Sequence, residues 1–544
     1  MARTRIRVAF AALVVIATIL TGCTVSKTTT SSAPQALTTD LIEPVAIDPY
    51  NLQDTDGAEI VSNIFEGLVK FDAASGKVKP AVAERWEANK DATIWIFHLK
   101  KGTKFHNGRE VEAGDFKYAW ERIANPKLDP ASPISYHLAA VKGYDEMQNG
   151  VATQLAGVVV KDKYTLEVDL AYPFADFIYV VGNPALTPVP KEEVEKDPAA
   201  FAEKPIGNGP FMMAEPWKHD QYIKIKRFDG YTGEKPKLDQ VTFDIFKDDV
   251  SGYNEFQAGD LDYLKTIPTG QLKTAVAKYG KSADGYEPTD AGRVMLGTEA
   301  SVYMLSINDQ NPILKNADLR RAMSLAINRD AINQLVFSGT RRAATGLVAP
   351  GVVGFKENAG AYCKYDKKQA QEFLKKAGYP DGNGLPVIKM VYNPGQDHEK
   401  VMEAVQNDFK AIGIRTELQV MEPAQLGPYM HTDKHEIIRR TWSLDYPILD
   451  NALYPLFYSK NIDQDNAARY SNPEVDKLLI DGRKELDEKK RVADYRKAEQ
   501  LILDDAAVIP LNFYSHRAVA QKWVKGLVYG PLSLTDYSHV YIEK

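Results

Sequence analysis

Hydrophobic and polar positions follow two different periods along the chain, and together they predict a mixed α/β protein. Residues 164–170 and 437–442 are short runs rich in β-branched and aromatic side chains, as in strands. Residues 115–123 instead repeat their apolar positions every three or four residues, as in an amphipathic helix. Its inward stripe comprises Phe116, Ala119, Trp120 and Ile123.

The first half of the chain reads as one body interrupted by a smaller α+β unit. An amphipathic helix carries Ile60, Val61, Ile64, Phe65 and Leu68 on one stripe, with a capping-box-like start at Asp56 and Glu59. Strands are expected at residues 93–99, 164–170, 221–227 and 241–246, with a turn and polar loop at 101–109 and a helix around 191–194. We therefore expect residues 72–204 to be an insertion.

A second α/β body begins near residue 300. Residues 302–307 form a predicted strand, and Asn316 can cap the helix that follows. The strand 386–392, the helix 400–412 and the strand 415–420 make a βαβ unit, which implies a parallel strand pair. Further helices are expected after Asn472-Pro473 and around 492–502, before residues 508–514 lead back to the first body. Two connections, near 296–302 and 510–516, then form a hinge, and the crevice between the bodies is the expected ligand site.

Residues 436–447 combine a strand with polar groups that a strand does not need. Alternation places Arg440 and Trp442 on one face, and Arg439 and Thr441 on the other. Asp445 follows the carboxyl end of the strand, where ligands of open α/β sheets often bind. The alternative is a core strand with a Trp cap and a turn-forming Asp.

The first 22 residues have the pattern of a signal peptide. Arg3, Arg5 and Arg7 precede the apolar stretch 8–20, which is short for a transmembrane helix of about 20 residues. Leu20-Thr21-Gly22-Cys23 is similar to a bacterial lipobox, which implies cleavage before Cys23 and a diacylglyceryl group on its sulfur. Residues 24–34 read as a flexible polar tether.

The net charge argues against a nucleic-acid partner, and the cysteine content argues against a disulfide. Removing residues 1–22 removes three arginines and no acidic residue, so the net charge changes from −6 to −9. Because nucleic-acid-binding proteins are usually basic, we expect no nucleic-acid partner. Beyond Cys23 the only cysteine is Cys363, which leaves no intrachain disulfide and predicts an inert, partly buried thiol.

The chain carries no recognisable catalytic motif. No phosphate-binding G-x-x-x-x-G-K-S/T loop, G-x-S-x-G elbow or H-E-x-x-H helix is present. His431 and His435 are four residues apart, but their segment leads into a strand and lacks an obvious third metal ligand. We expect both histidines to be solvated, and we expect no enzyme activity, no metal and no cofactor.

Several segments resemble the extracellular solute-binding proteins of family 5, which serve oligopeptide and dipeptide ABC importers. The family-like patterns are N-I-F-E-G-L-V at 63–69, A-E-R-W at 83–86, F-x-L-x-x-G-x-x-F-x-x-G at 97–108, D-F-x-Y-A-W-x-R at 115–122 and W-x-x-D-Y at 442–446. The resemblance covers essentially the whole mature chain. It implies an α/β, periplasmic-binding-protein-like two-lobe clamp (class II, cluster C type) with an inserted α+β subdomain.

The implied domain plan follows from the predicted elements and the resemblance. After the signal peptide (1–22) comes a lipidated tether (23–36), and lobe I is discontinuous, formed by 37–71, 205–298 and 515–544. The inserted subdomain spans 72–204, and lobe II spans 299–514.

The resemblance also implies ligand-binding residues. Asp445 matches the aspartate that holds a peptide's α-ammonium group, and Arg439 matches an arginine that pairs with the carboxylate in some oligopeptide binders. His398, at a helix start where an anion is favoured, matches a histidine that can meet the same carboxylate; a merely exposed His398 and a structural Arg439 are the alternatives. The remaining candidates are Trp442, Gln53 and Thr55. Phe513 and Tyr514 could contact the ligand as an aromatic surface, and core packing is the alternative for both. Gln53 and Pro423 stand where some relatives have Glu and a stacking Trp.

The expected function is an extracytoplasmic binding protein that closes around a short peptide and delivers it to the permease and ATPase subunits of an ABC transporter. It would be a monomer, lipid-anchored on the outer face of the cytoplasmic membrane. Alternatives are the same role for an oligosaccharide, a nickel chelate or an opine, and a peptide-sensing surface lipoprotein. A secreted hydrolase lacks motif support.

Overall fold

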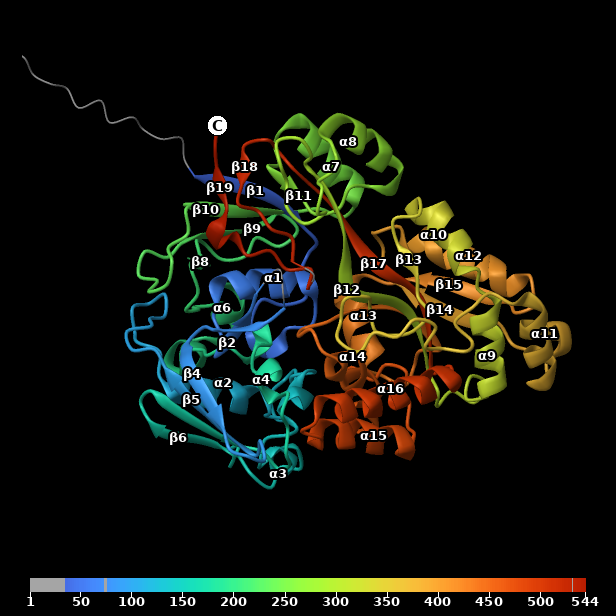
Figure 1. Cartoon of the computed structure of the whole chain (residues 1–544), viewed down its shortest axis with the longest axis horizontal. Helices are drawn as coiled ribbons and strands as arrows, with labels where there is room; N and C mark the ends of the chain where they lie inside the picture. Colours follow the sequence, from blue (N-terminus) through green and yellow to red (C-terminus); the bar gives the residue numbers. More distant parts are fainter. Residues whose placement is uncertain (1–34, 73–75, 531) are drawn as a thin grey trace, which may run out of the picture. The chain divides into compact units, whose positions relative to one another are not determined.

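An 11-stranded mixed sheet extends from β15 in the second half of the chain to β8 in the first half (Figure 1). In the computed structural model, residues 35–72, 76–530 and 532–544 are described, and the predicted signal peptide, Cys23 and nearly all of the tether lie outside them. The order of the sheet is β15 (Thr416–Val420), β14 (Ile388–Tyr392), β16 (Ile437–Ser443), β12 (Val294–Ile307), β17 (Val508–Ala520), β11 (Tyr263–Leu264), β1 (Ala36–Leu41), β10 (Gln240–Ile245), β9 (Tyr222–Arg227) and β8 (Phe211–Met213), with β13 (Arg342–Ala343) beside β17.

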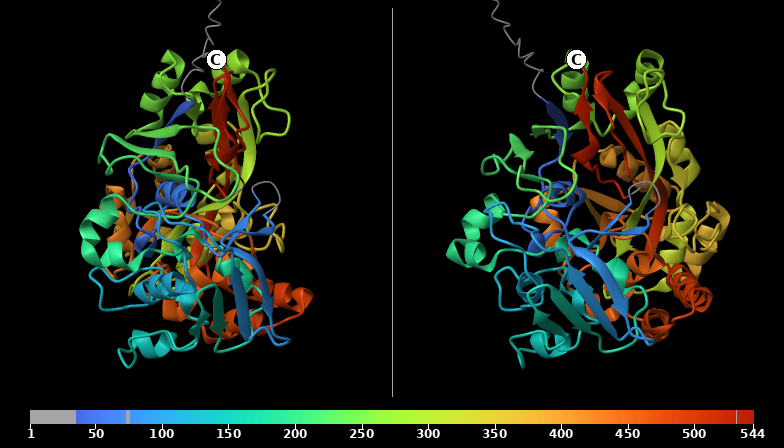
Figure 2. Two further views of the ribbon diagram at one scale, coloured as in Figure 1. Left: turned by 90° about the vertical axis from the view of Figure 1, so that its left-hand side faces the viewer. Right: turned by 60° about the vertical axis from the view of Figure 1, so that its left-hand side comes forward.

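The two predicted crossing segments are neighbouring antiparallel strands. β12 and β17 pair from Val294 opposite Val519 to Ser306 opposite Val508, and both turned views in Figure 2 show them side by side. Their register shifts between Thr298 and Val302. Such an irregularity interrupts the hydrogen-bond ladder and bends the strands locally. The bend lies within the stretch where the sequence predicts the hinge.

The βαβ unit predicted in the second body is present. β14 and β15 are parallel, and α12 (His398–Lys410) connects them while burying Val401, Val405 and Phe409. Asn316 accepts hydrogen bonds from the N–H groups of residues 318 and 319 at the start of α9. The remaining helices here are α9 (Ala317–Ala326), α10 (Arg329–Phe337), α11 (Lys367–Lys376), α13 (Pro423–Met430), α14 (Leu449–Phe457), α15 (Pro473–Lys484) and α16 (Glu488–Asp504).

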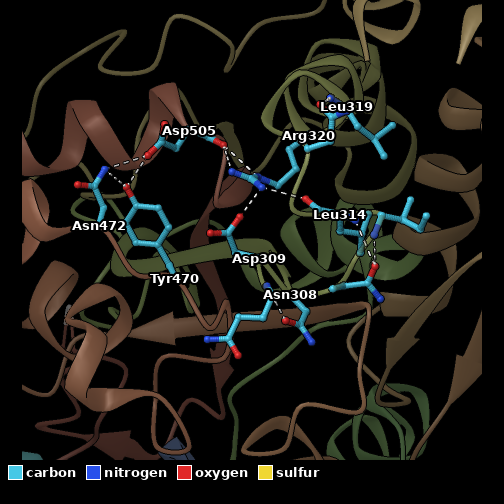
Figure 3. Close-up of polar contacts among 12 residues, drawn as sticks. Asn308, Asp309, Leu314, Leu319, Arg320, Tyr470, Asn472 and Asp505 are labelled. Atoms are coloured by element: carbon cyan, nitrogen blue, oxygen red, sulfur yellow. Dashed lines mark hydrogen bonds and ion pairs between the residues drawn. The ribbon is translucent and has the colours of Figure 1, made fainter. Parts of the chain in front are cut away.

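A polar network centred on Arg320 of α9 connects this helix to the ends of β12 and α16 (Figure 3). The Nε and Nη2 groups of Arg320 donate to the carbonyl of Asp505 at 3.0 and 2.8 Å, and its guanidinium pairs with Asp309 after β12. Tyr470 donates to the Asp505 carboxylate at 2.6 Å. Because Arg320 is buried, these contacts satisfy a charge that would otherwise destabilise the fold.

A separate four-stranded antiparallel sheet lies wholly within residues 72–204. Its order is β4 (Ala83–Ala88), β5 (Ile94–Leu99), β7 (Thr165–Asp169) and β6 (Val158–Asp162), next to α2 (Ala113–Ile123), whose predicted apolar stripe is buried. The short elements around this sheet are β2 (Val69–Phe71), β3 (Val78–Pro80), α3 (Tyr144–Gln148), α4 (Phe177–Val180), α5 (Lys191–Lys196) and α6 (Pro198–Glu203). The lobe and subdomain boundaries themselves remain predictions.

Two details at the amino end differ from the expectation. Ala36, which lies within the range predicted for the tether, begins β1 and pairs with Gln240 of β10. Helix α1 (Thr55–Ile64) begins at the cap Asp54, whose carboxylate accepts from the Gly57 N–H at 2.8 Å, and not at Asp56. The other elements on this side are α7 (Asp249–Ala258), α8 (Leu272–Tyr279), β18 (Val524–Lys525) and β19 (Tyr541–Ile542).

Cys363 is buried, as expected, and burial raises the pKa of its thiol to about 11. The thiol is therefore protonated and unreactive at neutral pH. Within the described residues, no helix combines the length and apolar character needed to cross a membrane.

Candidate ligand-binding site

Two cavities, each with a volume of about 270 Å³, meet along strand β16. Residues that line both are Val45, Asp54, Thr55, Asn393, Pro423, Arg439, Thr441 and Ser443. The first cavity extends toward Asp445, and the second extends toward Tyr514 on β17. Because they share walls from segments far apart in the chain, they form the two ends of one crevice.

Strand β16 presents a free edge to this crevice. β12 pairs with β16 as far as Ser443, whereas β14 pairs with it only at Ile437 and Ile438. Among the described residues, no strand pairs with the outer edge of residues 439–443. Unpaired backbone groups of this kind can accept an extended chain as an added strand.

The alternation predicted for β16 is confirmed by its contacts. On one face, the Arg440 guanidinium lies 5.1 Å from the centre of the Trp442 ring and pairs with Asp465. On the other, Arg439 donates from Nη2 to the Thr441 hydroxyl at 2.5 Å. The strand therefore directs a cation into each side of the crevice.

Asp445 lies at the end of the first cavity, two residues beyond β16. Its side chain is 33% exposed, and Asn451 Nδ2 donates to its Oδ2 at 2.9 Å. Burial raises the pKa of Asp445 to about 7, an effect opposed by the Asn451 hydrogen bond and increased by the charge of Asp465. The exposed part of the carboxylate faces the cavity.

The positively charged partner that Asp445 would need is missing among the described residues. The nearest basic nitrogen is His137 Nε2, 3.8 Å from Oδ2. Burial lowers the pKa of His137 to about 4, so this imidazole is neutral at pH 7. The Asp445 carboxylate is therefore available to a cation from outside the protein.

A buried ion pair supports the segment that positions Asp445. Arg483 donates from Nε and Nη2 to the two carboxylate oxygens of Asp450 at 2.7 and 2.9 Å, and both side chains are essentially inaccessible to solvent. Tyr446 and Tyr495 donate to the same carboxylate at 3.0 and 2.9 Å. These contacts to Asp450 therefore hold the segment 445–451 in place.

Arg439 occupies the wall between the two cavities. It donates from Nη1 to Asn393 at 2.9 Å and from Nη2 to the Tyr514 hydroxyl at 2.7 Å. Burial alone would raise the pKa of Tyr514, but the charges of Arg439 and Arg341 and the hydroxyl hydrogen bonds outweigh it, and the pKa is lowered. Tyr514 is thus a polarised hydroxyl on the cavity wall.

His398 begins α12 and lines the second cavity, but it is buried and not exposed. Burial, with the charges of Arg439 and Arg341, lowers its pKa well below the usual value. Its Nδ1 has no hydrogen-bond partner among the described residues. The neutral imidazole is therefore a possible hydrogen-bonding group for a ligand, and an unfavourable site for a second positive charge.

The other predicted residues divide between cavity and core. Gln53 and Thr55 line the first cavity, with Gln53 exposed, and Pro423 borders both cavities at the start of α13. Phe513 is buried against Phe355, with ring centres 6.2 Å apart, and does not line either cavity. The core interpretation therefore holds for Phe513.

The expectation for His435 was wrong. Its side chain is buried, and Nε2 lies 2.7 Å from the Ala467 carbonyl. His431 lines the first cavity. Among the described residues, no three His, Cys, Asp or Glu side chains are grouped to hold a metal ion.

Sequence patterns did not identify several residues of the crevice. His137 and Asp465 lie beside Asp445, while Arg341 and Arg517 line the second cavity. They come from the inserted region, from loops and from the far half of β17. None has a local motif, and only the tertiary fold brings them to β16.

Comparisons with known proteins agree with this architecture. The family model of the bacterial extracellular solute-binding proteins, family 5 middle, matches residues 77–464. The dipeptide-binding protein DppE of Bacillus subtilis is 30% identical over 510 residues, covering 91% of this chain and 89% of that protein.

Solved structures show the same fold. The murein tripeptide-binding protein MppA of Escherichia coli has a TM-score of 0.85 at 26% identity, covering 94% of this chain and 99% of that one. MppA in its unliganded open form has a TM-score of only 0.66, at the same identity and covering 94% and 98% of the two chains. This chain therefore has the α/β architecture of a periplasmic two-lobe binding protein, in an arrangement distant from that open form. It belongs to the bacterial extracellular solute-binding proteins of family 5.

Proposed function

We propose that this protein binds short peptides in the crevice along β16 and delivers them to the permease and ATPase subunits of an ABC importer. It catalyses no reaction and acts as a monomer. Cys23 carries the lipid that holds it at the outer face of the cytoplasmic membrane. The lipobox-like sequence supports the anchor, and the peptides bound by the relatives, as their names state, support the peptide ligand.

The observation that carries the proposal is the unpaired carboxylate of Asp445. Among the described residues, the only side chain that donates to it is the uncharged Asn451, and His137 is neutral at pH 7. A partly buried carboxylate without a cation is unfavourable, so a ligand ammonium group would gain a strong charge-assisted hydrogen bond there. A peptide's α-ammonium group has the required charge and size.

The rest of the crevice suits the remainder of an extended peptide. The free edge of residues 439–443 can pair with the peptide main chain, which would allow many side chains to be accepted. Arg439, at the far end of this edge, can receive the terminal carboxylate. Residues 439–443 of β16 span four steps of extended chain, about 13 Å, and Asp445 follows two positions later, which suits peptides of a few residues.

Calorimetric titration tests the proposal directly. Protein refolded from denaturant to remove bound ligand is titrated with the unmodified peptides from dialanine to pentaalanine. We expect saturable one-to-one binding of at least one length. Absence of heat with all of them, together with release of a non-peptide molecule on denaturing protein from its own host, would overturn the peptide assignment.

A further inference from the structure

Three buried arginines line the second cavity without an acidic partner. Arg341, Arg439 and Arg517 are 7%, 7% and 3% exposed, and no Asp or Glu oxygen of the described residues lies within ion-pair distance of them. Their side-chain hydrogen-bond partners are neutral: Asn512 for Arg341, Thr269 for Arg517, and Asn393, Thr441 and Tyr514 for Arg439. Buried cations normally pair with an anion, because desolvating an unpaired charge is costly.

Arg341 and Arg439 meet at one tyrosine. The Arg341 guanidinium lies 3.8 Å from the centre of the Tyr514 ring and 3.9 Å from that of Phe337, so two aromatic rings hold it. Arg439 donates to the hydroxyl of the same Tyr514. The two positive charges therefore contact a single aromatic side chain, Arg341 over its ring and Arg439 at its hydroxyl.

Three buried nitrogens of residues that line this cavity lack partners among the described residues, and two of them are guanidinium donors. The Nε atoms of Arg341 and Arg439 and the Nδ1 atom of His398 are buried and have no hydrogen bond to any described residue. All three residues line the second cavity. Unsatisfied buried donors on two neighbouring guanidinium groups are expected of a site that binds an anion.

The acidic residues of this cavity do not neutralise the pair. Lys265 holds Glu59 at 2.6 Å and Asp56 at 3.6 Å, and Glu299 accepts hydrogen bonds from Tyr529 and Ser533. Among the groups around Arg517, Asp249, Asp397 and Glu299 partly offset its charge, whereas Arg341 adds to the repulsion. The acidic residues that line this cavity outnumber its basic ones, but no described carboxylate lies within ion-pair distance of Arg341 or Arg439.

We propose that Arg341 forms a second anion site beside Arg439, so that the preferred peptides end in Asp or Glu. This inference rests on the proposed peptide-binding function. Arg439 receives the α-carboxylate of the last residue, and Arg341 receives the carboxylate of that residue's side chain. One acidic residue at the end of the peptide supplies both anions.

The test compares isosteric peptides that differ only in this charge. Peptides of one to four alanines followed by Glu are titrated calorimetrically against the same series ending in Gln. We expect the tightest Glu peptide to bind at least about 10-fold more tightly than its Gln counterpart. The variants are Arg341→Met and Arg341→Lys, with Arg342→Met as matched control, because Arg342 is exposed and pairs with Glu357.

Each outcome decides a different question. In Arg341→Met the preference for Glu over Gln peptides should vanish, while Gln peptides bind as before. Arg341→Lys should retain part of the preference for Glu. Arg342→Met should retain the full preference. If Arg341 is a binding group, the thermal unfolding midpoint of the empty Arg341→Met protein should not fall, since an unpaired buried charge is removed. Equal binding of Glu and Gln peptides by the wild type overturns this inference and leaves the proposed function standing. No binding of any peptide overturns both.

Discussion

Asn451 and Asp445 exchange two hydrogen bonds. The Asn451 amide donates to the Asp445 carboxylate at 2.9 Å, and its carbonyl oxygen accepts from the Asp445 backbone N–H at 2.9 Å. The same residue's backbone carbonyl accepts from the Trp442 indole at 2.7 Å. Asn451 thus orients Asp445 without neutralising it, which is the arrangement that a receptor for a ligand cation needs.

Replacing Asp445 by Asn should remove the ammonium partner and keep its shape. Truncating one member of a buried charge pair costs about 2–5 kcal/mol, so free peptides should bind roughly 30-fold to several-thousand-fold more weakly. Calorimetry measures the change. The empty variant should be at least as stable as the wild type, because burial disfavours this carboxylate.

N-acetylated peptides provide the control for Asp445→Asn. They should bind poorly to the wild type and lose little more in the variant, because they carry no ammonium group. If free and acetylated peptides lose equal affinity, Asp445 is only a turn residue.

Peptide binding should weaken below pH 7 through Asp445. Its pKa in the empty protein is about 7, and a bound ammonium group should lower that pKa, so binding releases a proton where the empty site is protonated. Affinity should fall as the pH decreases from 7 toward the pKa of the complex, and it should fall again above about pH 8, where the peptide's α-ammonium group loses its proton. Titrations between pH 5.5 and 8.5 measure this.

The same pH series in Asp445→Asn identifies the titrating group. Asp54 also lines the crevice, and burial with the charge of Asp56 raises its pKa to about 7. A pH dependence that persists unchanged in Asp445→Asn would assign the effect to another carboxyl group.

Replacing Arg483 by Met should destabilise the fold strongly. It leaves the buried Asp450 carboxylate without its cation, and breaking such a pair typically costs about 3–5 kcal/mol. Urea unfolding followed by tryptophan fluorescence measures the loss. Lys484→Met is the matched control on α15, and Arg483→Met with Asp450→Leu should recover part of the loss. Unchanged stability in Arg483→Met would contradict a supporting role for this pair.

Replacing Cys23 by Ser should release the protein from the membrane. Anchoring by acyl chains depends on their burial at about 0.8 kcal/mol per methylene, and the serine cannot receive the thioether-linked lipid. Fractionation of host cells should move the protein to the soluble fraction with peptide binding intact. Retention in the membrane fraction would contradict the lipobox interpretation.

Peptide binding should make the protein more compact in solution. The TM-scores show that this chain lies far from the open form of MppA, and the register shift in β12 and β17 provides a place to bend. A ligand that contacts both sides of the crevice shifts the equilibrium toward closure. Small-angle scattering should show a smaller radius of gyration with saturating peptide; an unchanged radius at saturation would contradict hinge closure.

The sequence alone predicted most elements, because their signals are local. The alternation in β16, the apolar stripe of α2 and the caps at Asn316 and Asn472 each depend on residues a few positions apart. It also led to Asp445 and Arg439 through a family-like segment. Local periodicity shows which residues share a face, but it does not show what that face meets.

The tertiary structure decided which faces become the crevice. Phe513 and Tyr514 are consecutive strand residues and point to opposite sides, so Phe513 packs in the core while Tyr514 reaches the cavity. Arg341, a loop residue without a motif, faces the same tyrosine more than 170 positions later in the chain. The pKa of Asp445 likewise depends on burial by distant segments. Such features arise from long-range packing, which the spacing of residues along the chain does not encode.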